Sequence, residues 1–313
     1  MFIETRRKGK NKKYYAVQSF REGKEVVKIR KYLGQNLSKQ ELREKQKQAD
    51  TRIKEQLKYY REIRDPLKYA LSSAELQQLK TLEARGAIKI EHLSEQNWRR
   101  FSELFSYHTN AIEGSTLTQH EVTELIETGK IPSKNPQDVE ESRGVVEAIQ
   151  YLRKTKEHLS SGLIKKLHNI VFKHTKSFAG RFRNVEVVIR DSLGNIVHRG
   201  APSQQIEQLL KELVQWYDKN KKKYPPILLA AVVHNQVENI HPFQDGNGRV
   251  GRLLLNNILL KHKLPPVNIQ LEKRQTYYQA LQAYQNTGNI RPMIELILKE
   301  YRKLRGQLGD HEI

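Results

Sequence analysis

The sequence contains no cysteine, and its longest purely apolar run extends only from Ile227 to Val233. Without cysteine the chain has no disulfides, no thiolate metal sites and no cysteine nucleophile. The apolar run is far shorter than the roughly 20 residues that cross a bilayer. Met1 to Arg7 lack an apolar segment after their charges, so we expect no signal peptide. We therefore expect a soluble, cytoplasmic protein with no membrane association.

Acidic residues are scarce beside basic ones. The 313 residues include 35 Asp+Glu against 56 Lys+Arg, which gives a formal net charge of +21. Such an excess favours a polyanionic partner such as nucleic acid. Residues 1–65 hold 20 Lys+Arg and 9 Asp+Glu, a net charge of +11, so the remaining 248 residues carry only +10. The excess is concentrated in the N-terminal part.

The first 66 residues predict two small elements. Residues 1–36 form a basic, β-rich unit, with strands over 13–20 and 24–32, a hairpin loop over 21–23 and a candidate third strand at Phe2-Ile3. A sheet this small buries little and is expected to pack against something else. Residues 37–66 predict an exposed helical linker that begins at the capping box of Ser38 and Glu41.

Residues 67–313 have helical periodicity and predict a mainly α domain. One interval, 184–198, is β-rich: Val185, Val187 and Ile189 alternate before a turn at 191–195. A lone hairpin cannot form the core of a helical domain, so we expect this hairpin to be a flap that lies over another part of the domain. The expected helices cover roughly 74–84, 95–112, 118–128, 137–156, 161–174, 203–219, 226–239, 248–261, 273–286 and 291–304.

The segment His241 to Arg252 concentrates the residues that carry chemistry. A glycine-rich turn that leads into a helix exposes backbone N–H groups, and the helix dipole favours an anion there. Arg249 and Arg252 are three residues apart on the first helical turn, where both can grip phosphates. Asp245 suits Mg²⁺, and His241 is the group able to take a proton near neutral pH. The pattern indicates a Mg²⁺–triphosphate cradle beside a general base.

Two other interpretations of this segment remain. Gly246 to Gly251 satisfies G-x-G-x-x-G, but a dinucleotide fold needs a strand directly before the glycines, and the preceding element is helical. No Lys-Ser/Thr pair follows the glycines, which excludes a P-loop. The other interpretation is structural: a glycine-rich turn with a core histidine and solvated arginines.

The segment resembles the signature of the Fic family, H-P-F-x-[D/E]-G-N-G-R-x-x-R, and matches it at every fixed position. The resemblance extends over about residues 95–300. It includes Gly180-Arg181-Phe182-Arg183, Ala201-Pro202, Tyr278 and Gly288-Asn289. It implies a Fic-type helical bundle with a β-hairpin flap, which transfers AMP from ATP to a hydroxyl side chain of a target protein.

The resemblance also implies roles for single residues. His241 deprotonates the Ser, Thr or Tyr hydroxyl, and Asp245 holds Mg²⁺ between the α- and β-phosphates. A phosphotransferring branch of the family carries Lys where this chain has Gly248, which favours nucleotidyl transfer here. Phosphate binding is expected from the turn residues Gly246, Asn247 and Gly248 and from Arg249 and Arg252.

A second motif, Thr109 to Gly114, resembles the family's inhibitory pattern [S/T]-x-x-x-E-[G/N]. Thr109 and Glu113 share one helix face, and Gly114 suits the position after a helix end. A glutamate at a helix end is by itself most often solvated. The resemblance implies an inhibitory helix at about 95–114. Its Glu113 pairs with Arg252, so that ATP binds with its phosphates misplaced for in-line attack. Some relatives of this class also remove AMP.

The expected partners follow from these motifs. The edge of the 184–198 hairpin can align a target segment by β-augmentation, or it is an ordinary surface hairpin. Self-modification and a homodimer are further expectations. The alternative function is a nucleic-acid-binding regulatory protein acting through residues 1–65, whose strand pattern faintly resembles N-terminal modules of some transposases. A solvated basic sheet and a catalytically silent Fic-like protein are the remaining alternatives.

Overall fold

The structure is a computed structural model that describes residues 1–22, 25–64, 66–67, 71–85, 93–190, 194 and 196–309. Of the expected hairpin loop at 21–23, Arg21 and Glu22 lie within a strand and position 23 lies outside the described residues. The expected turn at 191–195 lies outside them except for position 194. By compactness the chain divides into two units, Met1–Glu62 and Ile63–Ile313.

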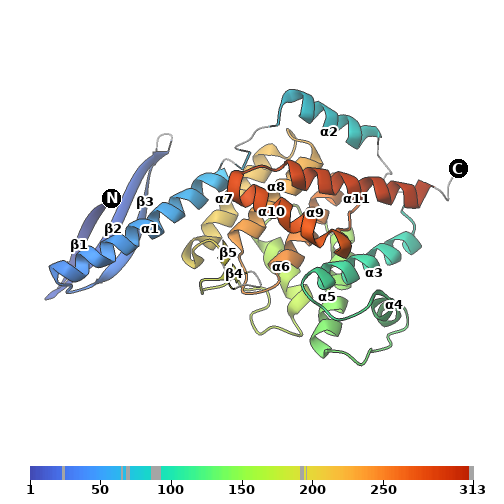
Figure 1. The fold of residues 1–313 in the computed structure, drawn as a ribbon, viewed down its shortest axis with the longest axis horizontal. Helices are drawn as coiled ribbons and strands as arrows, with labels where there is room; N and C mark the ends of the chain where they lie inside the picture. Colours follow the sequence, from blue (N-terminus) through green and yellow to red (C-terminus); the bar gives the residue numbers. More distant parts are fainter. Residues whose placement is uncertain are drawn as a thin grey trace. The chain divides into compact units, whose positions relative to one another are not determined.

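The first unit is a three-stranded antiparallel sheet with a helix on one face (Figure 1). The strands β1 (Phe2–Lys8), β2 (Asn11–Glu22) and β3 (Glu25–Gln35) lie in sequence order. The helix α1 (Lys39–Arg64) begins at the predicted capping box, where Ser38 N–H donates to Glu41 at 2.8 Å. The third strand, expected from Phe2-Ile3, is present.

The core of this unit lies between the sheet and α1. Ala16, Ile29 and Leu33 from the strands pack with Ala49 and Ile53 from the helix. The residues expected to form an exposed linker therefore also supply part of a hydrophobic core. The sheet needs this partner because three short strands alone bury too little apolar surface.

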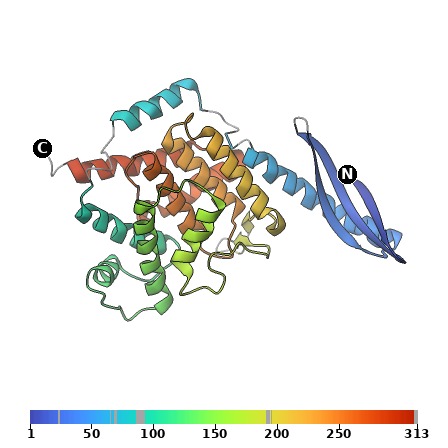
Figure 2. The same cartoon turned by 180° about the vertical axis from the view of Figure 1, so that it is seen from behind.

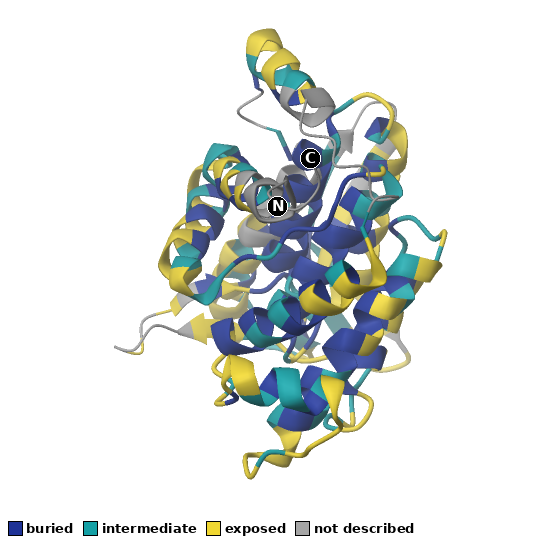
Figure 3. Ribbon diagram, turned by 90° about the vertical axis from the view of Figure 1, so that its right-hand side faces the viewer, coloured by how far each residue is buried: buried dark blue, intermediate teal, exposed yellow. Residues whose placement is uncertain are grey.

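The second unit is built almost entirely of helices, which confirms the expected mainly α class. Its central helix, α8 (Pro226–Ile240), is buried over Ile227 to Ile240, and Figure 3 shows the buried interior in dark blue. The first half of α8 is apolar all round, whereas the second half also buries polar side chains, Asn235 and Glu238 among them. The other helices are α2 (Ser73–Arg85), α3 (Glu95–Ile112), α4 (Gln119–Glu127), α5 (Pro136–Lys154), α6 (Ser161–Phe172), α7 (Ile206–Asn220), α9 (Asn247–Lys261), α10 (Arg274–Thr287) and α11 (Arg291–Gly309), with short 3₁₀ turns η2 (Ser203–Gln205) and η3 (Leu271–Lys273).

The β interval is present but shorter than expected. β4 (Val188–Arg190) pairs antiparallel with β5 (Ile196–Arg199). Val185 and Val187 precede β4. The Val185 carbonyl accepts from the Arg183 side chain at 2.6 Å, whereas the Val187 carbonyl still accepts from Gly200 N–H, directly after β5, at 3.1 Å. Ile189 is the expected flap residue that lies within the strand.

The helices were also compared with the requirements of a membrane span. Among the described residues, none of the helices combines the length and the apolarity needed to cross a bilayer.

Close packing of α5 against α6 depends on a glycine, which gives a test of the fold. A Cβ at Gly144 would lie 2.5 Å from the carbonyl oxygen of Val171. We expect Gly144→Ala to lower the free energy of unfolding by about 1–3 kcal/mol, measured by urea denaturation. The control is Gly162→Ala in α6, where the nearest atom is 3.5 Å away. Equal stability of both variants would contradict this account of the α5–α6 contact.

Candidate active site

The motif segment forms a short loop between two buried helices, α8 and α9. His241 ends α8 in the left-handed conformation, with φ 52° and ψ 62°, and Pro242 prevents the helix from continuing. Gly246, with φ 82°, starts α9 in a conformation that favours glycine. The loop therefore begins and ends at residues with positive φ, His241 and Gly246.

Asn247 holds this loop in shape. Its Oδ1 accepts from Phe243 N–H at 2.8 Å, and its Nδ2 donates to the Phe243 carbonyl at 2.9 Å. The side chain is buried and both ends are occupied. The Asn247 side chain therefore closes the loop. An anion at this turn would be bound by backbone N–H groups.

His168 lies under the loop, consistent with a structural histidine. Its ring stacks on Phe243 with centroids 3.8 Å apart. Gly180 N–H donates to Nδ1 at 2.9 Å, so Nε2 carries the proton that is donated to the Asp245 carbonyl at 3.1 Å. Burial lowers the pKa of His168 to about 4, which keeps the ring neutral and fixes this tautomer.

His241 is half-buried and neutral. Burial, aided by the neighbouring His198 and Arg183, lowers its pKa to about 4. Its Nδ1 faces the Glu238 carbonyl at 3.3 Å, so Nδ1 is the nitrogen that carries the proton. The lone pair on Nε2 is then available to accept a proton at neutral pH.

Arg183 is a positioning residue to which the sequence assigned no role. Its guanidinium is buried and donates to the carbonyl groups of His241 at 2.7 Å, Ile240 at 3.3 Å and Ala201. With its bond to Val185, it ties the end of α8 to both ends of the hairpin. The Gly-Arg-Phe-Arg run marked this place, but the contacts span 58 residues of sequence and are not visible in a pattern.

Asp245 combines exposure with cationic neighbours. Its side chain is 46% exposed, and its oxygens lie 2.8 Å from Lys176 Nζ and 3.5 Å from Arg249 Nη2. Burial works to raise the pKa of Asp245, but the hydrogen bond from Lys176 and the charge of Arg249 hold it below its usual value. The carboxylate is ionised at neutral pH and partly open to a ligand.

Arg249 and Arg252 point to different partners. Arg249 pairs with buried Glu141, lies within 3.4 Å of Asn110 Oδ1 and stacks over the Phe172 ring. It borders a polar pocket of about 170 Å³. That pocket is lined by Asn110, Glu113, Gly114, Ser115, Gln137, Asp138, Glu141, Asp245 and Arg249.

Arg252 is almost completely buried and makes four hydrogen bonds. Nε donates to Thr109 Oγ1 at 2.7 Å, and Nη2 donates to the Thr109 carbonyl at 2.9 Å. Nη1 donates to the Tyr277 hydroxyl at 3.1 Å, and Nη2 also donates to Glu113 Oε1 at 2.7 Å. Burial alone would lower the pKa of Arg252, but Tyr277 and Glu113 outweigh it and raise the pKa.

The end of α3 places the second motif against this arginine. Glu113 caps the helix, and Gly114 follows with φ 100°. Tyr278 donates to the carbonyl of Ile112 at 3.2 Å, which anchors the helix end to α10. Glu113 also approaches Gly248 closely: a Cβ there would lie 2.2 Å from Glu113 Oε1. The structure therefore brings the two predicted motifs together.

A second carboxylate, Glu238, lies on the buried side of Arg252 and was not anticipated from sequence. Its Oε1 is buried without a hydrogen-bond partner among the described residues. Burial and the charge of Glu113 raise the pKa of Glu238 to about 8, although Arg252 opposes the shift. Glu238 is therefore protonated at neutral pH, and Glu113 supplies the negative charge that pairs with Arg252.

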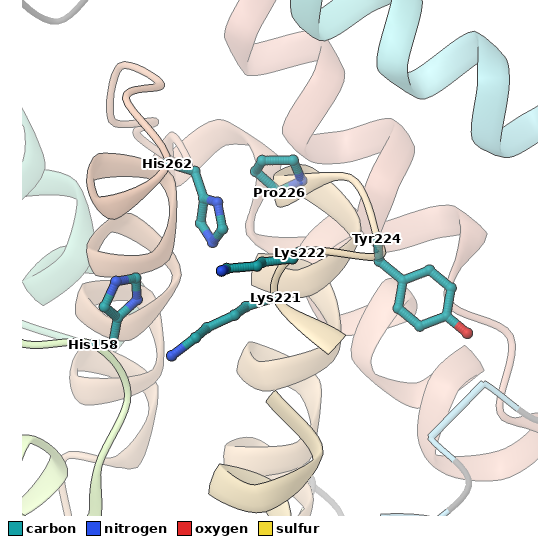
Figure 4. Close-up of a pocket in the computed structure, with 6 residues that line it drawn as sticks. All are labelled: His158, Lys221, Lys222, Tyr224, Pro226 and His262. Carbon is teal, nitrogen blue, oxygen red and sulfur yellow. The ribbon is translucent and has the colours of Figure 1, made fainter. Parts of the chain in front are cut away.

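A larger pocket of about 500 Å³ lies elsewhere in the second unit (Figure 4). None of the motif residues lines it. Its lining residues are His158, Lys221, Lys222, Tyr224, Pro226 and His262. The smaller polar pocket is thus the one that contains the predicted chemistry.

The site can be compared with known proteins. A model of the Fic/DOC family matches residues 158–259, the interval that contains the hairpin, α8, the loop and α9. Residues 158–259 are thus similar to the Fic/DOC family.

Two curated relatives and one solved structure support this. The protein adenylyltransferase Fic of Nematostella vectensis is 34% identical over 200 residues, 62% of this chain and 45% of the relative. The protein adenylyltransferase fic-1 of Caenorhabditis elegans is 35% identical over 204 residues, 63% of this chain and 39% of the relative. A structure of C. elegans Fic-1 (residues 134–508) gives a TM-score of 0.63 at 25% identity, covering 85% of this chain and 84% of that one.

These comparisons confirm the expected Fic-type fold. The chain spans less than half the length of these curated relatives. The family model covers the Fic domain from the residues before α6 to α9, whereas α3, which carries Glu113, lies outside the matched interval.

The Asn247 clamp of the Fic loop can be tested without an activity assay. We expect Asn247→Ala to speed amide exchange of Phe243 by roughly 30-fold, because two hydrogen bonds worth about 1 kcal/mol each are lost. Exchange is measured by mass spectrometry on peptides that span the loop.

Asn256 provides a matched control for this variant. Its side chain makes the same reciprocal pair of bonds to Val267, at 2.7 and 3.0 Å. Asn256→Ala should release Val267 and leave Phe243 unchanged. If both variants exposed Phe243 equally, the clamp would have no local effect and the assignment would be wrong.

Proposed function

We propose that this chain is a protein adenylyltransferase that transfers AMP from ATP to a Ser, Thr or Tyr hydroxyl of a target protein. The observation that carries the proposal is a neutral, half-buried His241 beside a glycine-rich helix N-terminus and a buried arginine. The names of the curated relatives, protein adenylyltransferases at 34% and 35% identity, support the same activity.

The N-terminal turn of α9 is the proposed phosphate site. Gly246 and Gly248 let phosphate oxygens approach backbone N–H groups, and the helix dipole favours their negative charge. Arg249 borders the pocket, and its Nε is buried without a hydrogen-bond partner among the described residues. Arg252 is the second proposed phosphate ligand, available once Glu113 leaves it.

Asp245 is the proposed residue for Mg²⁺. Across the described residues, no three His, Asp or Glu side chains converge as a metal-binding group. One ionised and partly exposed carboxylate nevertheless fits Mg²⁺, which takes one or two carboxylates and completes its shell with phosphate oxygens and water. A bound Mg²⁺ would neutralise phosphate charge; Lys176, now 2.8 Å from Asp245, supplies positive charge at the same place.

His241 is the proposed general base. Its Nε2 takes the proton of the target hydroxyl while the hydroxyl oxygen attacks the α-phosphorus of ATP. A P–O bond forms to the target, the bond to the β-phosphate oxygen breaks, and pyrophosphate leaves. Arg183 and Asn247 hold the backbone on either side of His241 and so fix the direction of Nε2.

The hairpin is the proposed docking site for the target segment. Val185 and Ile189 are exposed, Val187 is half-buried, and the hairpin base is fixed to α8 by Arg183. An extended target segment can add to a β4 or β5 edge and present its hydroxyl to His241.

Glu113 is the proposed inhibitor of this reaction. Four hydrogen bonds already occupy Arg252, and one of them goes to Glu113. While this pair persists, Arg252 cannot orient the outer phosphates, and misplacement of the α-phosphorus slows in-line attack. Removal of AMP, with Glu113 positioning water, is a further proposed activity of the same site.

The inhibition predicts a gain of activity. We expect Glu113→Gly to increase incorporation of label from α-³²P-ATP, on itself or on lysate proteins, by at least about tenfold, because Arg252 becomes free to bind phosphate. Glu127→Gly, at the exposed end of α4, is the matched control and should behave like wild type.

The same experiment tests the base. Adding His241→Ala to Glu113→Gly should abolish labelling. Equal labelling by wild type and Glu113→Gly would contradict the inhibition, and absence of labelling from all variants would contradict AMP transfer.

The depressed pKa of His241 gives a pH prediction for the Glu113→Gly variant. A histidine with a pKa near 4 stays neutral, and therefore competent as a base, from about pH 7 down to about pH 5. We expect the single-turnover rate to stay within about twofold over this range. A half-loss of rate near pH 6.5, the ordinary value for histidine, would show that His241 is not desolvated.

A further inference from the structure

The N-terminal sheet has one face that α1 does not cover. Side chains alternate across a strand, and the positions that face α1 include Ala16, Ile29 and Leu33. The alternate positions form the opposite face, which we call the open face. Its basic and aromatic residues come from all three strands and include Phe2, Arg6, Lys13, Tyr15, Lys28, Arg30 and Tyr32. Figure 2 shows the three strands on the near side of α1.

This face is strongly basic. Residues 1–36 contain 11 Lys+Arg against 3 Asp+Glu, a net charge of +8. On the open face, one acidic residue with described contacts, Glu4, pairs with Arg6 at 2.7 Å and with Arg30 at 2.9 Å. Lys13 and Lys28 have no carboxylate partner among the described residues. The face therefore carries positive charge that no neighbouring group neutralises.

The geometry of the face fits a duplex groove. Two spacings between strands make a three-stranded sheet about 10 Å wide from the first strand to the last. The major groove of B-form DNA is about 12 Å wide and accepts β-structure, with phosphates along both rims. Arg6 on β1 and Lys28 on β3 lie on the two outer strands, where they would reach opposite rims.

The aromatic residues argue against a single strand. Tyr15 and Tyr32 pack on one another with ring centroids 5.3 Å apart, and Arg6 lies 5.3 Å from the centroid of Tyr15. Unpaired bases bind by stacking on free aromatic faces. The Tyr15 ring already contacts Tyr32 and Arg6, so it is not free to stack on an unpaired base. The face would therefore recognise a nucleic acid by charge and shape.

We propose that the open face of the N-terminal sheet binds duplex DNA in the major groove, through phosphate contacts from Arg6, Lys13, Lys28 and Arg30. This binding site is separate from the proposed transferase site and involves none of its residues. It would give the chain a second, polyanionic ligand besides ATP.

The test measures binding of the full chain to a fluorescein-labelled mixed-sequence duplex of about 20 base pairs, two helical turns. We expect fluorescence anisotropy to show binding whose logarithm falls linearly with the logarithm of salt concentration. Lys13→Gln combined with Lys28→Gln should weaken binding about tenfold near 0.1 M salt and flatten the salt slope by roughly 1.8, for two lost phosphate contacts.

Two comparisons make the result specific to this face. Lys45→Gln combined with Lys47→Gln removes the same charge from exposed positions on α1 and should change affinity less than about twofold. Glu4→Gln removes the acidic partner of Arg6 and Arg30 and should tighten binding severalfold. A gain of affinity cannot come from misfolding.

Three outcomes would overturn the proposal. The first is no binding to the duplex at 50 mM salt. The second is tighter binding to a single strand or to RNA of the same length than to the duplex. The third is an equal loss of affinity in the open-face and α1 double variants, which would mean that only net charge matters. Activity of the Glu113→Gly variant is measured separately, so neither result decides the other.

Discussion

The burial of one permanent charge, the Arg252 guanidinium, organises the Fic domain. Removing a charge from water costs several kcal/mol unless partners compensate it. Here the compensation comes from two helices: the side chain and carbonyl of Thr109 and the capping Glu113 belong to α3, and Tyr277 belongs to α10. The same contacts also hold α3 and α10 against α9. The proposed inhibition would therefore use the interactions that pack these helices together.

The neighbouring ionisable groups differ in their protonation because their surroundings differ. His241 and His168 are neutral because burial disfavours their cations, whereas Asp245 remains ionised beside Lys176. Glu238 is protonated although it lies close to the same arginine that Glu113 contacts. The site therefore holds a free base, an available carboxylate and one neutralised cation, all at the same pH.

Local features of this protein were readable from the sequence, and long-range ones were not. Helical periodicity located α8 and α9 within a residue or two, the capping box of Ser38 and Glu41 located the start of α1, and the motifs placed His241 at the end of α8 and Glu113 at the end of α3. The partners of the buried charged groups could not be predicted. Glu141 beneath Arg249, Arg183 behind His241 and Glu238 beside Arg252 depend on which helices pack together, and no spacing along the chain encodes that. Val185 alternates like a strand residue, yet its carbonyl bonds to the Arg183 side chain.

The lack of a side chain at Gly248 serves two ligands that exclude each other. A phosphate needs the bare backbone of this turn, and the Glu113 carboxylate occupies the volume that a Cβ would fill. Nucleotide and inhibitor therefore compete for space as well as for Arg252. A Cβ at position 248 would meet the Glu113 carboxylate and force it to move. The proposed control by Glu113 therefore depends on the missing side chain at position 248 as much as on the carboxylate at the end of α3.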